Sequence, residues 1–159
     1  MAATLHLLSG KIAAGKSTLA ERLAADGAVL VSEDVWLAAL FADQMTSVQD
    51  YVRCSAKLRA VMGPHVAALL GAGVSVVLDF PANTVVTRAW MREIIDQSGA
   101  DHQLHVLDVP DEACLQRLHA RNAGGDHAFA ATEAQFWAIT KHYQPPTEDE
   151  GFQIVHHGA

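Results

Sequence analysis

The feature that most constrains this chain is the octapeptide GKIAAGKS at residues 10–17, which fits the pattern G-x-x-x-x-G-K-[ST]. The apolar segment 4–9 before it is typical of a buried strand, and the segment 17–24 after it has the apolar spacing of a helix. Strand, glycine-containing loop and helix, in this order, form the context in which the pattern indicates a phosphate-binding (Walker A) loop. These flanking segments favour a nucleotide site over a chance match in a chain rich in Gly and Ala.

The chemistry of such a loop follows from its residue types. Gly10 and Gly15 allow the main chain to curl, so that several amide N–H groups face one anion, and the following helix adds its positive dipole end. Lys16 is long enough to reach the β- and γ-phosphates, and Ser17 offers a hydroxyl ligand to Mg²⁺. We predict that the nucleotide phosphates are bound by Gly10, Ala13, Ala14, Gly15, Lys16, Ser17 and Thr18.

Composition limits the other possibilities. With 159 residues, half of them apolar, the chain is expected to form a single globular domain over residues 1–159. Its apolar runs are too short to span a membrane, and its first residues lack the basic segment of a signal peptide, so we expect a cytoplasmic protein. The net charge of −7 makes nucleic acid an unexpected partner and permits a neutral or cationic small substrate.

Two residue types that often mark metal or redox sites carry no such pattern here. Cys54 and Cys114 lack zinc or redox spacing and are expected to be reduced packing residues. His156 and His157 have no further ligands at suitable spacing, which favours a solvated tail over a weak metal site.

Apolar and helical segments alternate along the chain. Strands are expected at 4–9, 28–32, 74–80, 102–109 and 152–156, the first three of them buried, and helices at 17–24, 33–41, 46–70, 84–97, 110–121 and 132–143. Pro64 predicts two helices or a kink within 46–70, and residues 122–127 are expected to be a flexible loop. This order predicts an α/β fold of three layers around a parallel sheet, with ligands beyond the carboxyl ends of its strands.

Two carboxylates are expected at that edge of the sheet. Asp79 ends an apolar strand, where it can hold Mg²⁺ directly or through water, as in a Walker B motif, or simply cap a turn. Asp34 follows the strand 28–32 and can take a proton from an attacking hydroxyl, or can merely favour a helix start. Glu33 beside it leaves the identity of the base ambiguous by one residue, and we favour Asp34.

Arginines form the last candidate groups. Arg117 and Arg121 lie four residues apart, hence on one face of the predicted helix. This helix begins a predicted lid at about residues 117–131. From the lid the two arginines can neutralise charge on a transferred phosphoryl group, the alternative being a solvated helix face. Asn83 and Arg88 follow Asp79 and are predicted to hold the substrate, the alternatives being a helix cap and a surface arginine.

Taken together, four segments of the chain resemble the P-loop kinases of the AAA_33 type: residues 10–17, 32–34, 77–88 and 117–122. This group is related to the polynucleotide 5′-kinase domain, the zeta toxins and chloramphenicol phosphotransferase. The resemblance covers essentially the whole chain. It implies a five-stranded parallel sheet in the order 2-3-1-4-5, ATP with Mg²⁺ as donor and a hydroxyl as acceptor. It further implies that Asp34 is the base, that lid arginines contact the phosphates, and that the adenine lies near Arg117, Tyr143 and Pro145.

The chain departs from the polynucleotide kinases at one place. Those kinases resemble one another in having an arginine one turn after the base, whereas residues 35–38 here are Val, Trp, Leu and Ala. Together with the acidic charge, this disfavours a nucleic-acid acceptor. The large apolar side chains of this region are expected either to line an apolar substrate pocket or to belong to the core; they are Trp36, Leu37, Phe41 and Trp90.

The sequence therefore predicts an ATP-dependent kinase that phosphorylates a hydroxyl of a small molecule. The alternatives are a 5′-hydroxyl nucleic-acid kinase and a nucleotide-dependent switch ATPase. The absence of a Glu directly after Asp79 argues against a motor of the AAA type.

Overall fold

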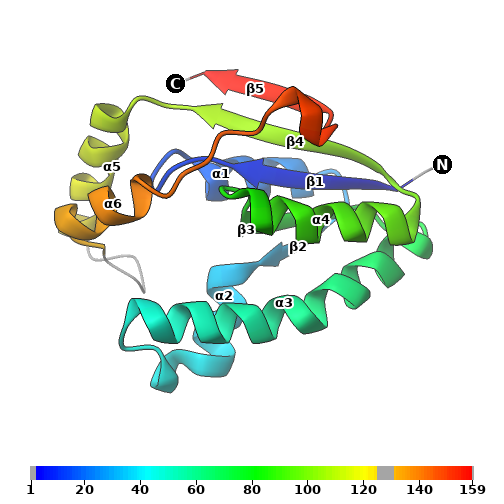
Figure 1. The fold of residues 1–159 in the computed structure, drawn as a ribbon, viewed down its shortest axis with the longest axis horizontal. Coiled ribbons are helices and arrows are strands. Elements are labelled where there is room, and N and C mark those ends of the chain that lie inside the picture. Colours follow the sequence, from blue (N-terminus) through cyan, green and yellow to red (C-terminus); the bar gives the residue numbers. More distant parts are fainter. Residues whose placement is uncertain (1–2, 125–130, 159) are drawn as a thin grey trace.

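The computed structural model describes residues 3–124 and 131–158, and the strands in these ranges form one parallel sheet (Figure 1). The strands are β1 (Thr4–Ser9), β2 (Val29–Ser32), β3 (Val76–Pro81), β4 (Asp101–Asp108) and β5 (Ile154–Gly158). Their order is β2-β3-β1-β4-β5, and every neighbouring pair runs parallel. The predicted fold class and strand order are thus confirmed.

Most of the helices that accompany these strands begin where the sequence supplies a capping residue. They are α1 (Lys16–Ala24), α2 (Glu33–Phe41), α3 (Val48–Gly71), α4 (Val85–Ser98), α5 (Asp111–Gly124) and α6 (Glu133–Thr140). Four of them start after a Ser or Thr whose hydroxyl accepts a hydrogen bond from an amide of the first turn; these residues are Ser32, Ser47, Thr84 and Thr132. Two short 3₁₀ turns, Ala42–Gln44 and Glu148–Glu150, follow α2 and precede β5.

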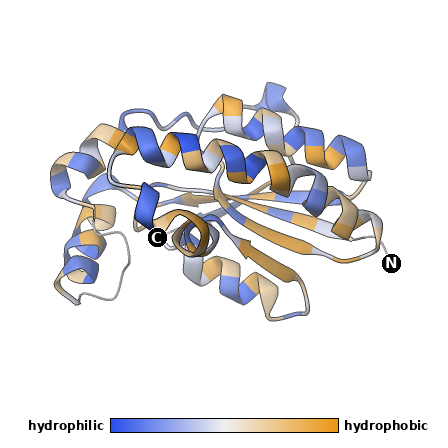
Figure 2. Ribbon diagram, turned by 90° about the horizontal axis from the view of Figure 1, so that it is seen from below, coloured by the Kyte–Doolittle hydropathy of each residue, from blue (hydrophilic) through white to orange (hydrophobic). Residues whose placement is uncertain are grey.

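The sheet is covered on its two faces by different helices (Figure 1). Leu5 and Leu7 of β1 point toward α3 and α4 and contribute to the main core with Leu58, Met62, Met91 and Ile94. Leu8 points the other way and packs against Leu19 and Ala20 of α1. This alternation is the period of a strand, and it makes the sheet ribbons largely hydrophobic while the helices are mixed (Figure 2). No helix in the described part of the chain is both long and apolar enough to cross a membrane.

A second, smaller core joins α5 and α6 to the loop that follows β1. Its buried members are Ala14 of that loop together with Val109, Cys114, Leu118, Ala131 and Phe136. Both cysteines are buried and free, as predicted. Because Ala14 is part of this cluster, the packing of α5 and α6 helps to fix the loop in place.

Three local expectations are wrong. The edge strand β2 is not buried throughout: Val29 is 40% exposed and Leu30 is 37% exposed, because β2 has a neighbour on one side only. The segment around Pro64 is one continuous helix, α3, so of the two predicted alternatives the division into two helices is wrong, and the kink stays a prediction. Residues 122–124 belong to α5 and not to a flexible loop, whereas 125–127, and 125–130 of the predicted lid, lie outside the described residues.

The C-terminal histidines belong to β5 and not to a solvated tail. His157 lies in a row with His105 of β4 and His6 of β1, with ring nitrogens 2.9 Å apart in one pair and 3.0 Å in the other. His156 Nδ1 lies at hydrogen-bond distance, 2.8 Å, from Asp108 Oδ2. The three rings lie side by side and do not converge on a point, and no metal-binding cluster is found among the described residues.

This row of imidazoles predicts a loss of stability in acid. Burial, together with the neighbouring His6 and His157, lowers the pKa of His105 to about 4. Between pH 6.5 and 4 the unfolded chain therefore binds more protons at this position than the native one, so that stability falls as the pH falls. We expect His105 to account for a loss of about 2 kcal/mol between pH 7 and pH 5, measured by denaturant unfolding. In His105→Gln the loss of stability between pH 7 and pH 5 should be smaller by this amount, whereas replacement of the exposed His65 should leave it unchanged. An equal loss in wild type and His105→Gln would show that His105 does not cause it.

Candidate active site

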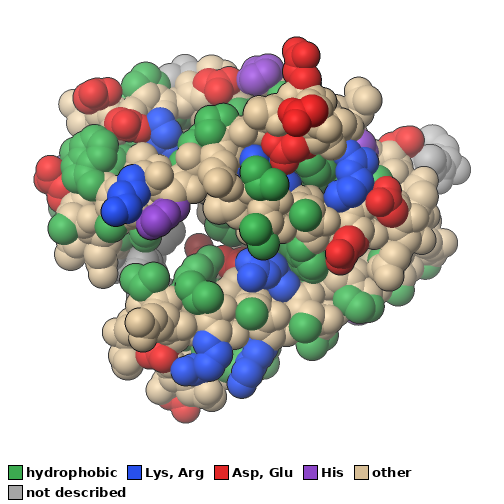
Figure 3. All heavy atoms as spheres, in the orientation of Figure 1, with side chains coloured by type: hydrophobic (Ala, Val, Ile, Leu, Met, Phe, Trp, Pro, Cys, Tyr) green, Lys and Arg blue, Asp and Glu red, His purple; other side chains and the backbone are tan. Residues whose placement is uncertain are grey.

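The carboxyl ends of the first four strands bring the predicted site residues to one edge of the sheet. The loop 10–15 follows β1, Asp34 follows β2, Asp79 lies near the end of β3, and α5 follows β4 (Figure 1). In the space-filling view the molecule is hollowed between the α2–α3 side and the α5–α6 side (Figure 3). This is the edge at which ligands bind in open parallel sheets.

The loop after β1 has the curled backbone that the motif requires. Gly15 has φ +105°, which side chains disfavour, and Ala13 adopts the left-handed φ of +63°. A Cβ added at Gly10 would lie 3.2 Å from that of Leu107, so the backbone passes β4 closely at this point. The ammonium of Lys16 donates hydrogen bonds to the carbonyls of Gly10 at 2.6 Å and Lys11 at 2.9 Å.

Side chains from distant segments anchor the start of this loop. Asn83 accepts a hydrogen bond from the Gly10 amide at 3.0 Å and donates one to the Gly10 carbonyl at 2.8 Å. The buried hydroxyl of Ser9 lies 3.2 Å from the Tyr143 hydroxyl and 3.4 Å from Asn83 Oδ1. Because both ends of the Asn83 amide are used by Gly10, its role differs from the predicted substrate contact: it positions the phosphate loop.

The other side of the loop is held by residues of α5. Lys11 forms an ion pair with Asp111 at 2.5 Å, and its ammonium lies 6.0 Å from the centre of the Tyr143 ring. Arg117 donates a hydrogen bond to the Ala14 carbonyl at 3.2 Å. The roles of Lys11, Asp111 and Ser9 were not predicted, because they depend on contacts between segments about a hundred residues apart.

Lys16, Asp79, Asp34 and Arg121 form a group of charges that influence one another. Burial lowers the pKa of Lys16 to about 8, and Asp79 and Asp34 oppose this shift. Burial also raises the pKa of Asp79. The positive charge of Lys16 opposes this rise, and the negative charge of Asp34 adds to it. The pKa of Arg121 is lowered by burial and raised by Asp34. Asp34 thus lies within electrostatic range of the loop lysine, the β3 carboxylate and the α5 arginine.

The two acids at the start of α2 have different surroundings. Glu33 is 3% exposed, and its carboxylate accepts hydrogen bonds from the hydroxyls of Tyr51 and, at 2.8 Å, Ser55. Burial raises the pKa of Glu33 above its usual range, while these two hydrogen bonds lower it. Asp34, in contrast, is exposed. This difference favours Asp34 over Glu33 as the group that can meet an acceptor.

Arg88 does not face the site, and the prediction that it holds the substrate is wrong. Its side chain is fully buried and forms a two-point ion pair with Glu150, from Nε to Oε1 at 2.7 Å and from Nη2 to Oε2 at 3.2 Å. It also donates to the carbonyls of Ala82 at 2.9 Å and Gln144 at 2.7 Å. Arg88 therefore fastens α4 to the segment before β5.

This arrangement predicts a large effect on stability. Arg88→Met should lower the free energy of unfolding by about 3 kcal/mol or more, because it leaves a half-enclosed carboxylate and two carbonyls without their donor. Denaturant titration measures this loss, with Lys57→Met, which removes an exposed cation from α3, as the control. Unchanged stability combined with weaker acceptor binding would restore Arg88 as a substrate contact.

The large apolar residues near Asp34 are mainly part of the core. Leu37 is 2% exposed, Phe41 packs against the main cluster, and Trp90 lies with its ring centre 5.4 Å from that of Phe80. Of the predicted apolar pocket, only Trp36 remains well exposed, at 39%. Of the two predicted alternatives, the core thus applies to Leu37, and Phe41 packs on that core while staying partly exposed.

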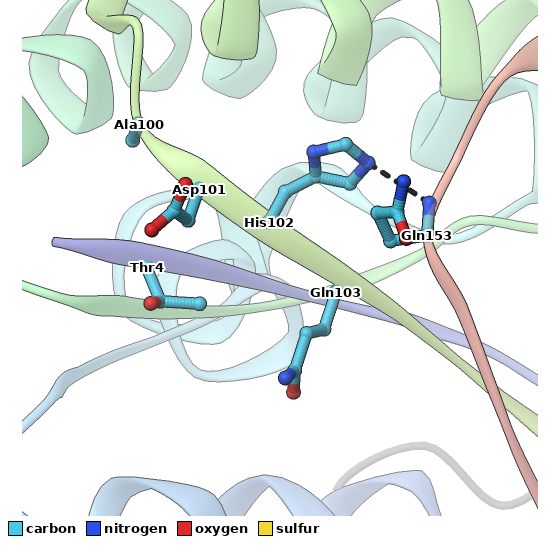
Figure 4. Close-up of a pocket in the computed structure, with 6 residues that line it drawn as sticks. All are labelled: Thr4, Ala100, Asp101, His102, Gln103 and Gln153. Atoms are coloured by element: carbon cyan, nitrogen blue, oxygen red, sulfur yellow. Dashed lines mark hydrogen bonds between the residues drawn. The ribbon is translucent and has the colours of Figure 1, made fainter. Parts of the chain in front are cut away.

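A separate open pocket of about 510 Å³ lies at the other end of the sheet (Figure 4). It is lined by Ala100, by the first residues of β1 and β4, and by Gln153, whose main-chain N–H donates a hydrogen bond to His102 Nε2 at 3.1 Å. Because the phosphate loop follows the last residue of β1, this pocket is remote from the candidate site.

The residues at the site fit a nucleotide with Mg²⁺. Ser17 is exposed at the start of α1, and Asp79 supplies a carboxylate close to Lys16; both are oxygen donors of the kind that Mg²⁺ prefers. Arg121 keeps its Nε without a hydrogen-bond partner among the described residues, although that atom is buried. An anion beside Arg121 would satisfy this donor.

Solved structures of several kinases share this fold. A candidate kinase from Chloroflexus aurantiacus J-10-fl matches with a TM-score of 0.78 at 19% identity, covering 98% of this chain and 85% of that one. The APS kinase CysC of Mycobacterium tuberculosis, solved with AMPPNP and APS, matches with a TM-score of 0.64 at 21% identity, covering 99% and 88%. A chain of the Pnkp1/Rnl/Hen1 RNA repair complex matches with a TM-score of 0.62 at 25% identity, covering 88% and 42%.

The comparison with curated proteins finds no match. The comparison with protein families finds the AAA domain family AAA_33, which matches residues 5–146. These residues include the phosphate loop, Asp34, Asp79 and Arg121. The chain therefore belongs to the AAA domain family AAA_33 and has the fold of the P-loop kinases.

Proposed function

We propose that this protein is an ATP-dependent kinase that transfers the γ-phosphoryl group to a hydroxyl of a small molecule. The observation that carries this proposal is the exposed carboxylate of Asp34, set within electrostatic range of the phosphate-loop lysine and of Arg121. A loop that binds phosphates explains the lysine, and the carboxylate near it supplies a proton acceptor that phosphate binding alone does not require. An acceptor hydroxyl does need such a group.

In this proposal each charged group has one task. Asp34 accepts the proton of the acceptor hydroxyl, whose oxygen forms a bond to the γ-phosphorus while the bond from that phosphorus to the β–γ bridging oxygen breaks. The products are ADP and a phosphate monoester. Lys16 and Arg121 neutralise charge that spreads over the phosphoryl oxygens during transfer, and Arg117 supports the loop at Ala14.

Ser17 and Asp79 are the residues that would hold Mg²⁺, which, when bound, supplies positive charge to the β- and γ-phosphates. The loop residues proposed to bind the phosphates are those from Gly10 to Thr18 named above. Asn83 acts indirectly, by fixing Gly10. The expected compartment is the cytoplasm, where ATP is plentiful.

Structural neighbours support a small acceptor over a nucleic acid. They include an APS kinase, a sugar kinase and a gluconokinase. The likeness to the RNA repair protein keeps a 5′-hydroxyl nucleic-acid kinase as the second candidate. The net charge of −7 opposes it, because no basic surplus is present to follow a phosphate backbone.

The test is a transfer assay with γ-labelled ATP, Mg²⁺ and a panel of sugars, hydroxy acids, nucleosides and oligonucleotides with a free 5′-hydroxyl. Label transferred to a small alcohol supports the proposal, and label transferred only to oligonucleotides supports the second candidate. Phosphate release that no acceptor stimulates would contradict both and point to a switch ATPase.

A further inference from the structure

A groove of about 280 Å³ lies between α3 and α4. Its lining is largely apolar, with one cation and one hydroxyl: Ala56, Arg59, Ala60, Val86, Thr87 and Trp90. Sequence reasoning did not single out Arg59 or Thr87. Figure 3 shows basic and hydrophobic side chains close to the hollow between the two halves of the molecule.

Arg59 stands out because its guanidinium has no hydrogen bond or ion pair with another described residue, although its side chain is half-buried. The other arginines nearby are engaged: Arg53 pairs with Asp50 at 3.2 Å, and Arg88 pairs with Glu150 at 2.7 Å. The donors of the Arg59 guanidinium are therefore available to a ligand, and its planar fork suits an anion.

The position of Arg59 connects the groove to the candidate base. Ser55 lies four residues earlier on α3, hence on the same helix face, and donates a hydrogen bond to Glu33, the residue next to Asp34. The charge of Arg59 also influences Glu33. Burial raises the pKa of Glu33, and the positive charge of Arg59 opposes part of this rise. The α4 wall of the groove begins just after β3, which carries Asp79. Both walls therefore start at the edge of the sheet where transfer is proposed.

We propose that this groove binds the non-reacting end of the acceptor alcohol, and that Arg59 binds a carboxylate on it. The inference rests on the proposed kinase function. Val86 and Trp90 contact an apolar body, and the planar guanidinium matches a carboxylate in two-point contact. One unpaired guanidinium balances one negative charge, which favours a carboxylate over a phosphate dianion. The acceptor class is thus a hydroxy acid in which an apolar body separates the reacting hydroxyl from the carboxylate.

This inference differs from the neutral or cationic substrate that the net charge permits. Net charge governs the long-range field, whereas affinity in a groove depends on the group in direct contact. A single cation in an apolar groove can therefore select an anion on an acidic protein.

The test compares two hydroxy acids whose hydroxyl and carboxylate lie at opposite ends, 6-hydroxyhexanoate and 4-(hydroxymethyl)benzoate, with their methyl esters. In wild type with MgATP, we expect the KM of each acid to be about 10- to 100-fold below that of its ester, the factor expected for a charged hydrogen-bonded pair. Arg59→Met should bring each acid within about threefold of its ester, and Arg59→Lys should restore part of the preference. Lys57→Met, which removes an exposed cation from the same helix, is the matched control and should behave as wild type.

A binding measurement separates this inference from the proposed function. The Kd of AMPPNP with Mg²⁺ should be the same in wild type and Arg59→Met, and the acids should bind to the AMPPNP-loaded wild type at least tenfold more tightly than to the variant. Binding with this preference but without phosphoryl transfer would contradict the kinase proposal and support carboxylate binding by Arg59 in the groove. Transfer to neutral alcohols, with acids and esters bound equally or with no acid bound, would overturn the role of Arg59 and leave the kinase proposal standing.

Discussion

In the Asp34→Asn variant, kcat for acceptor phosphorylation should fall about 10³-fold, while the Kd of MgATP changes by less than threefold. An amide has nearly the shape of a carboxylate but cannot accept the hydroxyl proton at neutral pH. Asp34 is exposed, so the substitution leaves no buried group without a partner and the fold should be kept. Steady-state kinetics combined with calorimetry of the nucleotide separate the two effects.

The matched control is Asp43→Asn, which removes an exposed carboxylate directly after α2 and should leave kcat unchanged. If Asp34→Asn lowers the affinity for MgATP but not the rate of transfer, Asp34 is a metal ligand and not the base. Glu33→Gln cannot replace this test, because Glu33 is buried against Tyr51 and Ser55 and its loss would disturb the packing of α2 on α3.

The second large effect is expected for Lys16→Ala, which should lower kcat/KM for ATP by about 10³-fold, or about 4 kcal/mol of transition-state stabilisation. The ammonium is the only cation that the described loop 10–17 can commit to the phosphates, because Lys11 is paired with Asp111. Among the residues that the structure describes, the Lys16 ammonium hydrogen-bonds only to carbonyls of its own loop, so its removal should not lower the thermal unfolding temperature by more than a few degrees.

Lys11→Ala provides the comparison, since it removes a charge of the same kind from the same loop. Its effect on kcat/KM should be tenfold or less. Equal losses in the two variants would mean that the loop acts through its overall charge and not through a placed ammonium. Full activity of Lys16→Ala would rule out the phosphate-loop mechanism.

The fold could be predicted from sequence because its signals are local. Apolar runs alternate with capped helices, and the glycine loop connects the first pair, so the layers and the parallel direction of the strands follow. The strand order came from the family resemblance. The exposure of Val29 and Leu30 could not be predicted, because an edge strand is as apolar as a central one and only its neighbours distinguish it.

The site residues could be predicted where a short motif fixes their geometry. The prediction failed where the position of a side chain depends on a partner far away in the sequence. The loop and the position of Asp34 after β2 follow from short stretches of chain. Arg88 was misassigned because its partner, Glu150, lies 62 residues away and no local pattern connects them. For the same reason an isolated arginine on α3 gave no sign that it lines a groove with α4.

The central claim is that the loop after β1 binds a nucleoside triphosphate, and titration calorimetry of the intact chain with ATP in millimolar Mg²⁺ tests it most directly. We predict saturable binding of one ATP per chain in wild type and at least a hundredfold weaker binding in Lys16→Ala with the same unfolding temperature. No heat of binding from ATP or GTP to the folded wild-type protein would contradict the account.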